Sequence, residues 1–408
     1  MRRFILWATL PVIALYGCCG NSTSKEVAAF ETISKEMKSR FAPDSRSNTL
    51  EVTIEKTDNG YVLKGATNQP EAKEAYVQAF QEKGITVLDS IKTLPDAALE
   101  GKIYGVSTQS VINFRTSGKY SAESATQAMM GTPLRILEKK GGWTRAITPE
   151  GYISWVTSGS IEYMTEEEFN KYMEAPKVIV TDKYVTMTEQ PSASSLMVSD
   201  AVWGNILLDL GTVGAWQKVA IADGRTGYLP KSSVQDFNKW LDSRNPTADN
   251  IIATAKQFIG VPYMWGGTSI KAVDCSGFCK STYFLNGIIL ARDASQQCYT
   301  GDDVDITKYV NDSTYTVEAL SNLKKGDLIF FGTKATPEKK ERITHVGIYI
   351  ENGIFIHSAT KVRINSLIPT DANYYDGSKR LVRAQRILGN QDKGKGIVSV
   401  VNDYTIKK

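Results

Sequence analysis

Histidine and cysteine are scarce in this chain. Among its 408 residues only 2 are His and only 5 are Cys. Any reaction that needs an imidazole must therefore use His345, His357 or both. Small disulfide-stabilised domains carry many closely spaced cysteines, so this composition does not indicate a disulfide framework.

An excess of charge of one sign is also missing. The 48 basic and 44 acidic residues give a formal net charge of +4, too weak and too evenly spread to indicate a nucleic-acid partner. Hydrophobic residues make up 42% of the chain and charged residues 23%, which argues against both disorder and a polytopic membrane protein. At roughly 150 residues per domain, the length suggests two to four folded units.

The first residues are typical of an export signal. Met1-Arg2-Arg3 is basic, and the apolar run over 4–16 is too short to span a bilayer as a mature helix. The segment Leu15-Tyr16-Gly17-Cys18 resembles the lipobox of bacterial lipoproteins, although Tyr16 replaces the usual small residue, and an ordinary secretory signal is the alternative. We therefore expect 1–18 to be a lipoprotein-like signal peptide, Cys18 to be lipidated, and the protein to reach the bacterial cell envelope, facing the periplasm.

Export changes how the cysteines are interpreted. Cys18 and Cys19 belong to the processing site, which leaves Cys275, Cys279 and Cys298 in the body of the chain. An odd number leaves at least one thiol unpaired, and an unpaired thiol in an exported protein needs a reason. Cys279, one helical turn after Cys275, is expected to pack as a small hydrophobic residue. Cys298 suggests no function.

Residues 19–100 are expected to form a small α+β domain. Apolar positions at helical spacing over 27–37, and a second segment over 71–83, predict two helices. Alternating residues with an Asn-Gly turn over 49–65 predict a hairpin, and 85–91 predicts a third strand. The unit faintly resembles a BON-like domain, and nothing in it suggests catalysis.

Two similar segments follow, with the short strands and frequent turns of small β-barrels. Residues 101–175 contain an Asn-x-Arg strand, a Gly-Trp strand and the ending Gly151-Tyr152-Ile153-Ser154-Trp155, which resemble a bacterial SH3-like barrel. A weaker copy over 176–238 ends in Thr226-Gly227-Tyr228. We therefore expect two SH3-like β-barrels in tandem.

A polar linker over 239–247 leads into a mixed α/β domain over 248–389. Thr247 can cap the first helix of that domain. The tail over 390–408 contains Lys393-Gly394-Lys395-Gly396 and is expected to be flexible.

The densest motif in the chain surrounds Cys275. This residue follows a loop that contains Gly266-Gly267 and precedes a predicted helix that ends at Asn286-Gly287. A Cys that begins a helix faces the unpaired N–H groups of the first turn, whose partial positive charge stabilises a thiolate. Such a nucleophile still needs a base and a residue that orients the base.

Both histidines fall in one predicted hairpin, with strands over 343–350 and 354–358. Because side chains alternate along a strand, His345 and His357 share a face only if paired residue numbers have an even sum. A two-residue turn at Asn352-Gly353 gives an odd sum. A catalytic pair therefore predicts an odd-length loop or a bulge, and a tight type I′ turn would count against it.

Over 248–388 the chain resembles the NlpC family of papain-like cell-wall endopeptidases. The motifs that carry the resemblance are, in order, Pro-Tyr-x-Trp-Gly-Gly, Asp-Cys-Ser-Gly-Phe, Arg-Asp-x-Ser-x-Gln, Gly-Asp-Leu-Ile-Phe-Phe, His-Val-Gly-Ile-Tyr and Ile-His-Ser. The resemblance implies that Cys275 is the nucleophile, His345 the general base and acid, and His357 the residue that orients His345. It also implies that Tyr263 lies near the oxyanion. The expected fold class is thus α+β multidomain, with a papain-like α+β catalytic domain.

The domain combination resembles recycling endopeptidases. This implies hydrolysis of the γ-D-glutamyl–diamino acid bond in peptidoglycan stem peptides with a free N-terminal L-Ala. Asp274 can supply one carboxylate for the ammonium, and Glu123 and Tyr152 match a Glu and a Tyr that the first barrel contributes in those enzymes. Further residues that could line the pocket are Trp265, Ser276, Asp293 and Ser295, although Arg292 and Asp293 could instead be a structural pair.

Several alternatives stay open. Cys275 with the two histidines could form a zinc site, but no closely spaced ligand pair accompanies them, and we expect no metal and no cofactor. The enzyme could act on intact peptidoglycan, or the chain could be a non-catalytic cell-wall-binding protein, whose signature would be a missing Cys or His. We expect a monomer that meets the membrane only through its lipid anchor.

Overall fold

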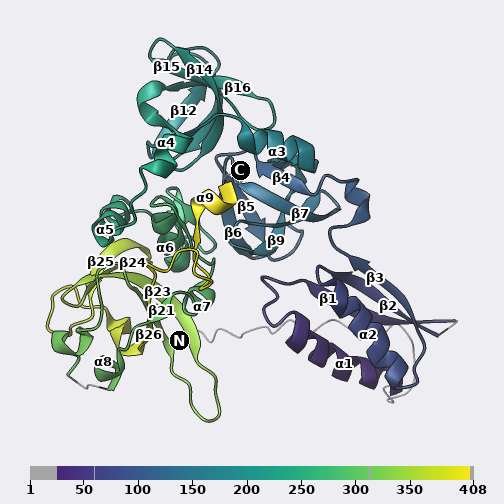
Figure 1. The fold of residues 1–408 in the computed structure, drawn as a ribbon. Coiled ribbons are helices and arrows are strands. Elements are labelled where there is room, and N and C mark those ends of the chain that lie inside the picture. The colour runs from purple at the N-terminus through teal and green to yellow at the C-terminus, as the bar shows by residue number, and fades with distance from the viewer. Residues whose placement is uncertain (1–24, 59, 312–313, 405–408) are drawn as a thin grey trace. The chain divides into compact units, whose positions relative to one another are not determined.

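The computed structural model describes residues 25–58, 60–311 and 314–404 (Figure 1). The expected signal peptide and Cys18 lie outside these residues. The chain divides into two compact units, 1–99 and 100–408. Within the described ranges, no helix is both long and apolar enough to cross a bilayer.

The first unit is a three-stranded sheet with two helices. The antiparallel hairpin of β1 (Leu50–Thr57) and β2 (Gly60–Thr67) is extended by β3 (Val87–Thr93), which runs parallel to β2. The helices are α1 (Lys25–Phe41) and α2 (Pro70–Glu82). Their apolar positions form a core with the sheet that includes Ile33, Leu63, Tyr76 and Phe80. This agrees with the α+β pattern expected from the sequence.

The second unit begins with a seven-stranded antiparallel sheet of order β10-β4-β7-β8-β9-β5-β6. Its strands are β4 (Tyr104–Ser107), β5 (Val111–Arg115), β6 (Ser124–Met129), β7 (Pro133–Lys140), β8 (Trp143–Ile147), β9 (Ile153–Thr157) and β10 (Ile161–Met164). The helix α3 (Glu166–Glu174) follows, with Thr165 and Glu168 forming a capping box at its start.

A second sheet repeats this topology. Its order, from the corresponding edge, is β17-β11-β14-β15-β16-β12-β13, so each strand matches the one seven places earlier in the chain. The strands are β11 (Lys177–Val180), β12 (Tyr184–Thr188), β13 (Met197–Val202), β14 (Ile206–Val213), β15 (Trp216–Ala220), β16 (Thr226–Pro230) and β17 (Val234–Asp236). The two segments are therefore copies of one fold.

The expected linker over 239–247 is shorter in the structure. The helix α4 (Phe237–Asp242) occupies its first part, because Phe237 and Trp240 are buried and anchor that turn in the core. The connecting segment is therefore limited to the residues between α4 and α5 (Ala248–Gln257). Thr247 caps α5 as expected, since its side chain accepts a hydrogen bond from Asn250 N at 3.2 Å.

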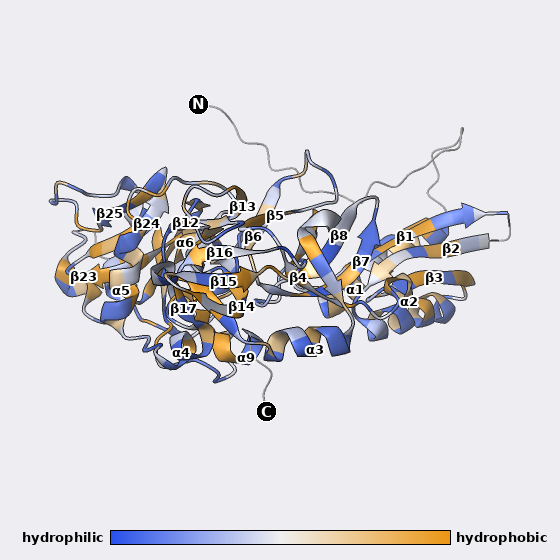
Figure 2. Cartoon of the chain, turned by 90° about the horizontal axis from the view of Figure 1, so that it is seen from above, coloured by the Kyte–Doolittle hydropathy of each residue, from blue (hydrophilic) through white to orange (hydrophobic). Residues whose placement is uncertain are grey.

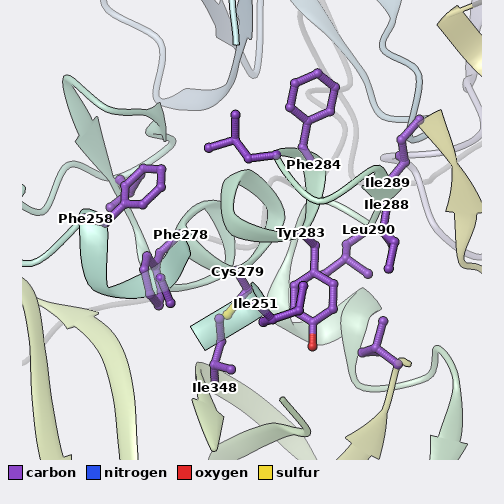
Figure 3. Packing of buried hydrophobic residues seen from close by; sticks show 14 of the residues in the cluster. Ile251, Phe258, Phe278, Cys279, Tyr283, Phe284, Ile288, Ile289, Leu290 and Ile348 are labelled. Carbon is purple, nitrogen blue, oxygen red and sulfur yellow. The ribbon is translucent and has the colours of Figure 1, made fainter. Parts of the chain in front are cut away.

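The remaining domain packs α5 and α6 (Cys275–Phe284) against a six-stranded antiparallel sheet of order β21-β26-β22-β23-β24-β25. Figure 3 shows Cys279 in this core among Ile251, Tyr283 and Ile348. The apolar residues of β23 are orange in Figure 2. The strands are β21 (Asp302–Asp303), β22 (Leu328–Thr333), β23 (Arg342–Glu351), β24 (Ile354–Ala359), β25 (Lys361–Ser366) and β26 (Leu381–Arg386), and short helices are α7 (Ala294–Gln297) and α8 (Thr307–Asn311).

The expectation of a flexible tail over 390–408 was wrong for the part described. The strand β27 (Val398–Ser399) pairs with β20 (Ile288–Ile289), and α9 (Val400–Tyr404) follows it. The cause is an apolar pattern after the Lys-Gly run, which buries Val400 and Tyr404. The Tyr404 ring packs on Phe284 with centroids 5.5 Å apart. This segment, yellow in Figure 1, is thus part of the core around α6.

Candidate active site

Cys275 is the first residue of α6. Asp274 caps the helix, since its side chain accepts a hydrogen bond from Gly277 N at 2.7 Å. Glycine is required at two nearby positions: Gly266 has φ +84°, and a Cβ on Gly277 would lie 1.9 Å from the Gly267 carbonyl oxygen. The glycines of the motif therefore allow the loop to pack closely against the start of α6, which buries the thiol.

The electrostatics of the thiol differ from the sequence expectation. Burial and then the neighbouring Asp274 carboxylate raise the pKa of Cys275 to about 12, although hydrogen bonds from the backbone N–H groups of Val346 and Ser276 oppose this. The helix N-terminus is therefore outweighed by desolvation. At neutral pH the free protein holds a protonated thiol, which must lose its proton to a base as it attacks.

The hairpin that carries the histidines contains the expected bulge. Glu351 pairs with Ile354 around a tight Asn352-Gly353 turn, in which both residues have positive φ. The register then shifts between Tyr349 and Glu351, and the remaining pairs have the even sum 704. The tight turn that would have separated the histidines is present, but the bulge at Ile350 compensates for it.

The two imidazoles lie on one face and contact each other. His345 Nε2 is 2.7 Å from His357 Nδ1, and His357 Nε2 is 3.0 Å from Asn365 Oδ1. Burial, and next the charge of the other ring, lower the pKa of His345 to about 3, and burial lowers the pKa of His357 to about 4. Both rings are therefore neutral at pH 7, as a general base must be.

The thiol lies against the strand that carries the first histidine, where α6 packs against β23. Val346, which directly follows His345, donates its backbone N–H to the Cys275 sulfur. Because Nε2 of His345 is engaged by His357, the nitrogen left for the thiol is Nδ1. The sheet thus brings together residues that are 70 positions apart in the sequence. A contact between the two histidines favours a proton relay over a pair of metal ligands.

Asp274 is held by an ion pair that the sequence did not indicate. Arg292, whose side chain is 1% exposed, donates from Nη2 to Asp274 Oδ2 at 2.7 Å and from Nη1 to Oδ1 at 3.2 Å. Gly266 N and Ser276 Oγ donate to the same carboxylate. The structural partner of Arg292 is therefore mainly Asp274, since Asp293 lies 3.8 Å away. The Arg292-Asp293 sequence does not mark Asp274, which lies 18 positions earlier, as the partner.

The first SH3-like sheet contributes a wall beside this site. The Tyr152 hydroxyl donates to Asp293 Oδ2 at 3.2 Å, which joins β8–β9 to the start of α7. Two further hydrogen bonds join this sheet to the catalytic domain. Arg292 Nε donates to Thr126 Oγ1 at 2.8 Å, and Thr268 N donates to Gln127 Oε1 at 2.9 Å. Tyr152 is thus placed against the catalytic domain, as its expected role requires.

The other expected pocket residues occupy different environments. Tyr263 is half-buried, and burial, with the nearby Cys275 next, raises its pKa. Glu123 is exposed, and its neighbour Ser124 packs against Gly266. Trp265 is 57% exposed, and Ser295 is half-buried in α7. Among the expected pocket residues, Tyr152 donates a hydrogen bond to Asp293, and Ser276 donates one to Asp274.

Comparisons with known proteins identify the families that this chain resembles. A family model described as the NlpC/P60 family matches residues 260–384, and one described as the bacterial dipeptidyl-peptidase Sh3 domain matches residues 114–161. A gamma-D-glutamyl-L-lysine dipeptidyl-peptidase of Bacillus cereus is 31% identical over 259 residues, which are 61% of this chain and 72% of that protein. A dipeptidyl-peptidase 6 of Lysinibacillus sphaericus is 25% identical over 260 residues, which are 60% of this chain and 85% of that protein.

A solved structure supports the fold. An NlpC/P60 family protein from Bacillus cereus superposes with a TM-score of 0.56 at 24% identity, covering 69% of this chain and 99% of that one. Together with the two family models, this confirms the α+β multidomain class, with an SH3-like module ahead of a papain-like domain.

Proposed function

Because the chain belongs to the NlpC/P60 family of cysteine peptidases, we propose that it hydrolyses the γ-D-glutamyl–diamino acid bond of peptidoglycan stem peptides with a free N-terminal L-Ala. The observation that carries this proposal is the hydrogen bond between Tyr152 and Asp293, since it puts a wall from the SH3-like sheet next to the catalytic domain. The relatives named above are aligned with about 60% of this chain.

We assign the chemical step to the buried thiol and the two imidazoles. His345 Nδ1 removes the proton of Cys275 as the sulfur attacks the γ-carbonyl carbon of D-Glu. The Cys275 backbone N–H and the Tyr263 hydroxyl stabilise the oxyanion, each donor contributing about 3 kcal/mol in comparable sites. Imidazolium at His345 then protonates the leaving amine of the diamino acid. Water, deprotonated by the same ring, hydrolyses the thioester.

Specificity for a free N-terminus needs anionic partners, because an unpaired buried ammonium is costly. Asp274 already forms an ion pair with Arg292, so we assign the direct contact chiefly to Asp293 and Glu123, with Tyr152 closing the pocket. Asp274 then orders the loop below the pocket. Trp265, Ser276 and Ser295 are assigned to its lining.

The test is hydrolysis of L-Ala-γ-D-Glu-L-Lys by purified protein. We expect Cys275→Ala to lower kcat at least 1000-fold, because no other group in the site supplies the nucleophile. Cys279→Ala, one turn further along the same helix and buried in the core, is the matched control and should keep most activity. Retained hydrolysis by Cys275→Ala contradicts the assignment. Digestion of intact sacculi instead of the tripeptide supports the wall-hydrolase alternative, and tight binding without turnover supports a binding protein.

We also propose export with a lipid anchor at Cys18, on the basis of the sequence before it. Metabolic labelling with a radioactive fatty acid in a bacterial host tests this. Label in the wild-type chain and none in Cys18→Ala is the expected result, whereas an unlabelled but secreted protein supports an ordinary signal peptide.

A further inference from the structure

A third residue continues the hydrogen-bonded chain of the two histidines. His345 lies on β23, His357 on β24 and Asn365 on β25, and the pairings of these strands put all three on one face of the sheet. The three side chains are linked in series, at 2.7 Å and 3.0 Å. All three residues are at most 9% exposed. Water therefore does not replace any of these contacts.

The far end of the chain is a group that can only accept. Asn365 Nδ2 donates to the backbone carbonyl oxygen of Asn373 at 2.7 Å, and the same oxygen accepts the Ser366 N–H at 3.0 Å. A carbonyl has no hydrogen to give, so the amide nitrogen of Asn365 must face it. The amide oxygen then faces His357. The orientation of the Asn365 side chain is thus fixed by the backbone.

The orientation of the Asn365 amide determines which atom donates in the other two hydrogen bonds of the series. Because Asn365 Oδ1 accepts, His357 Nε2 must carry the hydrogen, and in a neutral ring His357 Nδ1 then has the lone pair. That lone pair accepts from His345 Nε2, which leaves His345 Nδ1 without a hydrogen. His345 Nδ1 is the nitrogen proposed to take the proton of Cys275.

We infer that Asn365 is a positioning residue that, through the Asn373 carbonyl, fixes the tautomers of both histidines and leaves His345 Nδ1 as the basic nitrogen. This inference rests on the proposed thiol chemistry but concerns a residue that the family motifs do not include. The surroundings fit a neutral relay, since the charged groups acting on the rings are Arg363 and Arg380, both positive. The Tyr375 ring covers His357 at 4.8 Å between centroids.

The first test reads the tautomers directly. The chain contains only two histidines, so ¹⁵N-histidine labelling of the full-length protein gives two imidazoles. His345→Gln leaves the contact of His357 with Asn365 in place and so assigns the signal of His357, and the other signal is that of His345. At pH 7 we expect a protonated Nε2 and an unprotonated Nδ1 in both rings. A hydrogen on Nδ1 of His345 in the wild-type protein overturns the inference. This readout is independent of hydrolysis, so it can fail while the proposed function holds, or hold while that function fails.

The second test separates positioning from packing. Asn365→Leu removes the acceptor, so kcat should fall about 100-fold, the lower end of what a positioned base contributes, with little change in KM. Asn365→Asp still accepts from His357, so it should retain more activity than Asn365→Leu, with the acid limb of kcat shifted to higher pH. A merely structural role predicts the opposite order, because a carboxylate facing the Asn373 carbonyl is unfavourable.

The matched control is Asn373→Ala. Asn373 acts through its backbone carbonyl and is itself exposed, so this change should leave kcat and both tautomers unchanged. Equal losses in Asn373→Ala and Asn365→Leu would instead indicate a general disturbance of the loop and would count against the inference.

Discussion

Burial holds both histidines in their neutral form, and this lowers the stability of the folded protein at acidic pH. An unfolded imidazole has a pKa of 6.5, whereas burial lowers the pKa of His345 to about 3 and that of His357 to about 4. Between pH 6.5 and 4 the unfolded chain therefore binds more protons than the folded protein. Over that window the free energy of unfolding therefore decreases as the pH is lowered, by up to about 1.4 kcal/mol per pH unit for each ring.

We predict that the double variant His345→Gln, His357→Gln loses less stability than the wild-type protein between pH 6.5 and 4. Urea unfolding followed by tryptophan fluorescence measures this in the second unit, where Trp143, Trp155, Trp203, Trp216, Trp240 and Trp265 lie. The carboxylates are common to both proteins, so the difference isolates the imidazoles. Parallel pH dependences for the two proteins would show that the rings are not held neutral by burial.

At the residue scale, the sequence predicts what a local motif encodes. Cys275 stands out because its surroundings repeat a known motif, and the two histidines stand out because no others exist. Arg292 and Asn365 were not assigned these roles, because each acts through a side chain distant in sequence. The sequence contained a signal for Asn365. Paired residue numbers have an even sum between β23 and β24 and again between β24 and β25, so the odd-numbered His345, His357 and Asn365 all lie on one face.

At the scale of a single element, the bulge in β23 decides whether there is a site at all. Without Ile350, the pairing fixed by the Asn352-Gly353 turn would run through β23 and β24 unshifted, and His345 and His357 would point to opposite faces of the sheet. The residue numbers of the hairpin indicate that a compensating residue is needed. They do not place that residue, because several positions near the turn are compatible with a bulge.

Deleting Ile350 should therefore abolish hydrolysis. The expected loss is at least 1000-fold in kcat, since the base is removed from the thiol, and the measurement is tripeptide hydrolysis with circular dichroism as a check of folding. Ile350→Ala keeps the chain length, and so the register, and should retain measurable activity at reduced stability. Similar activity in the two variants would mean that the bulge does not set the position of His357.

The C-terminal segment is a second element whose role is larger than its sequence suggested. Tyr404 is 7% exposed and packs on Phe284 at the far end of the helix that begins with Cys275. The Lys-Gly run before it suggested flexibility, but the apolar residues that follow outweigh that local composition because a core is available to them.

We predict that Tyr404→Ala lowers the free energy of unfolding of the second unit by about 3 kcal/mol, as expected when a buried aromatic ring is removed. Tyr404→Phe keeps the ring and should lose less than half as much. Urea unfolding followed by tryptophan fluorescence provides both values. Equal stability of Tyr404→Ala and wild type would mean that the segment is not part of the core.

At the scale of the whole second unit, the proposed role of the first SH3-like sheet is to select the substrate, while the thiol performs the chemistry. We predict that Tyr152→Phe raises KM for the free tripeptide, while kcat changes less. The ratio of kcat/KM for the free tripeptide to kcat/KM for the N-acetylated tripeptide should therefore decrease. The physical reason is the lost hydrogen bond to Asp293, which no longer holds the carboxylate toward an ammonium.

Tyr228 provides a control for this prediction. It follows a glycine in β16 as Tyr152 does before β9, so Tyr228→Phe makes the same change in the other copy of the fold. We expect Tyr228→Phe to leave kcat and KM unchanged for both the free and the N-acetylated tripeptide. If Tyr152→Phe also leaves the preference for a free amine intact, the first sheet is not a specificity wall.

The helices and strands within the modules could largely be predicted from the sequence, because each module carries its own periodicity and turn residues. The contacts between modules could not. Arg292 with Thr126 and Thr268 with Gln127 pair polar groups from different sheets and helices, and nothing local marks them as partners.

The two SH3-like sheets share one strand order, and both contact the catalytic domain. The second copy binds it through Lys183 Nζ to the Gln257 carbonyl at 2.6 Å and through the Tyr184 hydroxyl to the Ile270 carbonyl at 3.1 Å, whereas the first copy reaches Asp293 through the Tyr152 hydroxyl. If Tyr152 serves the site and Tyr228 does not, the two copies are under different selection. In related genes we therefore expect substitutions to be frequent at Tyr228 and rare at Tyr152.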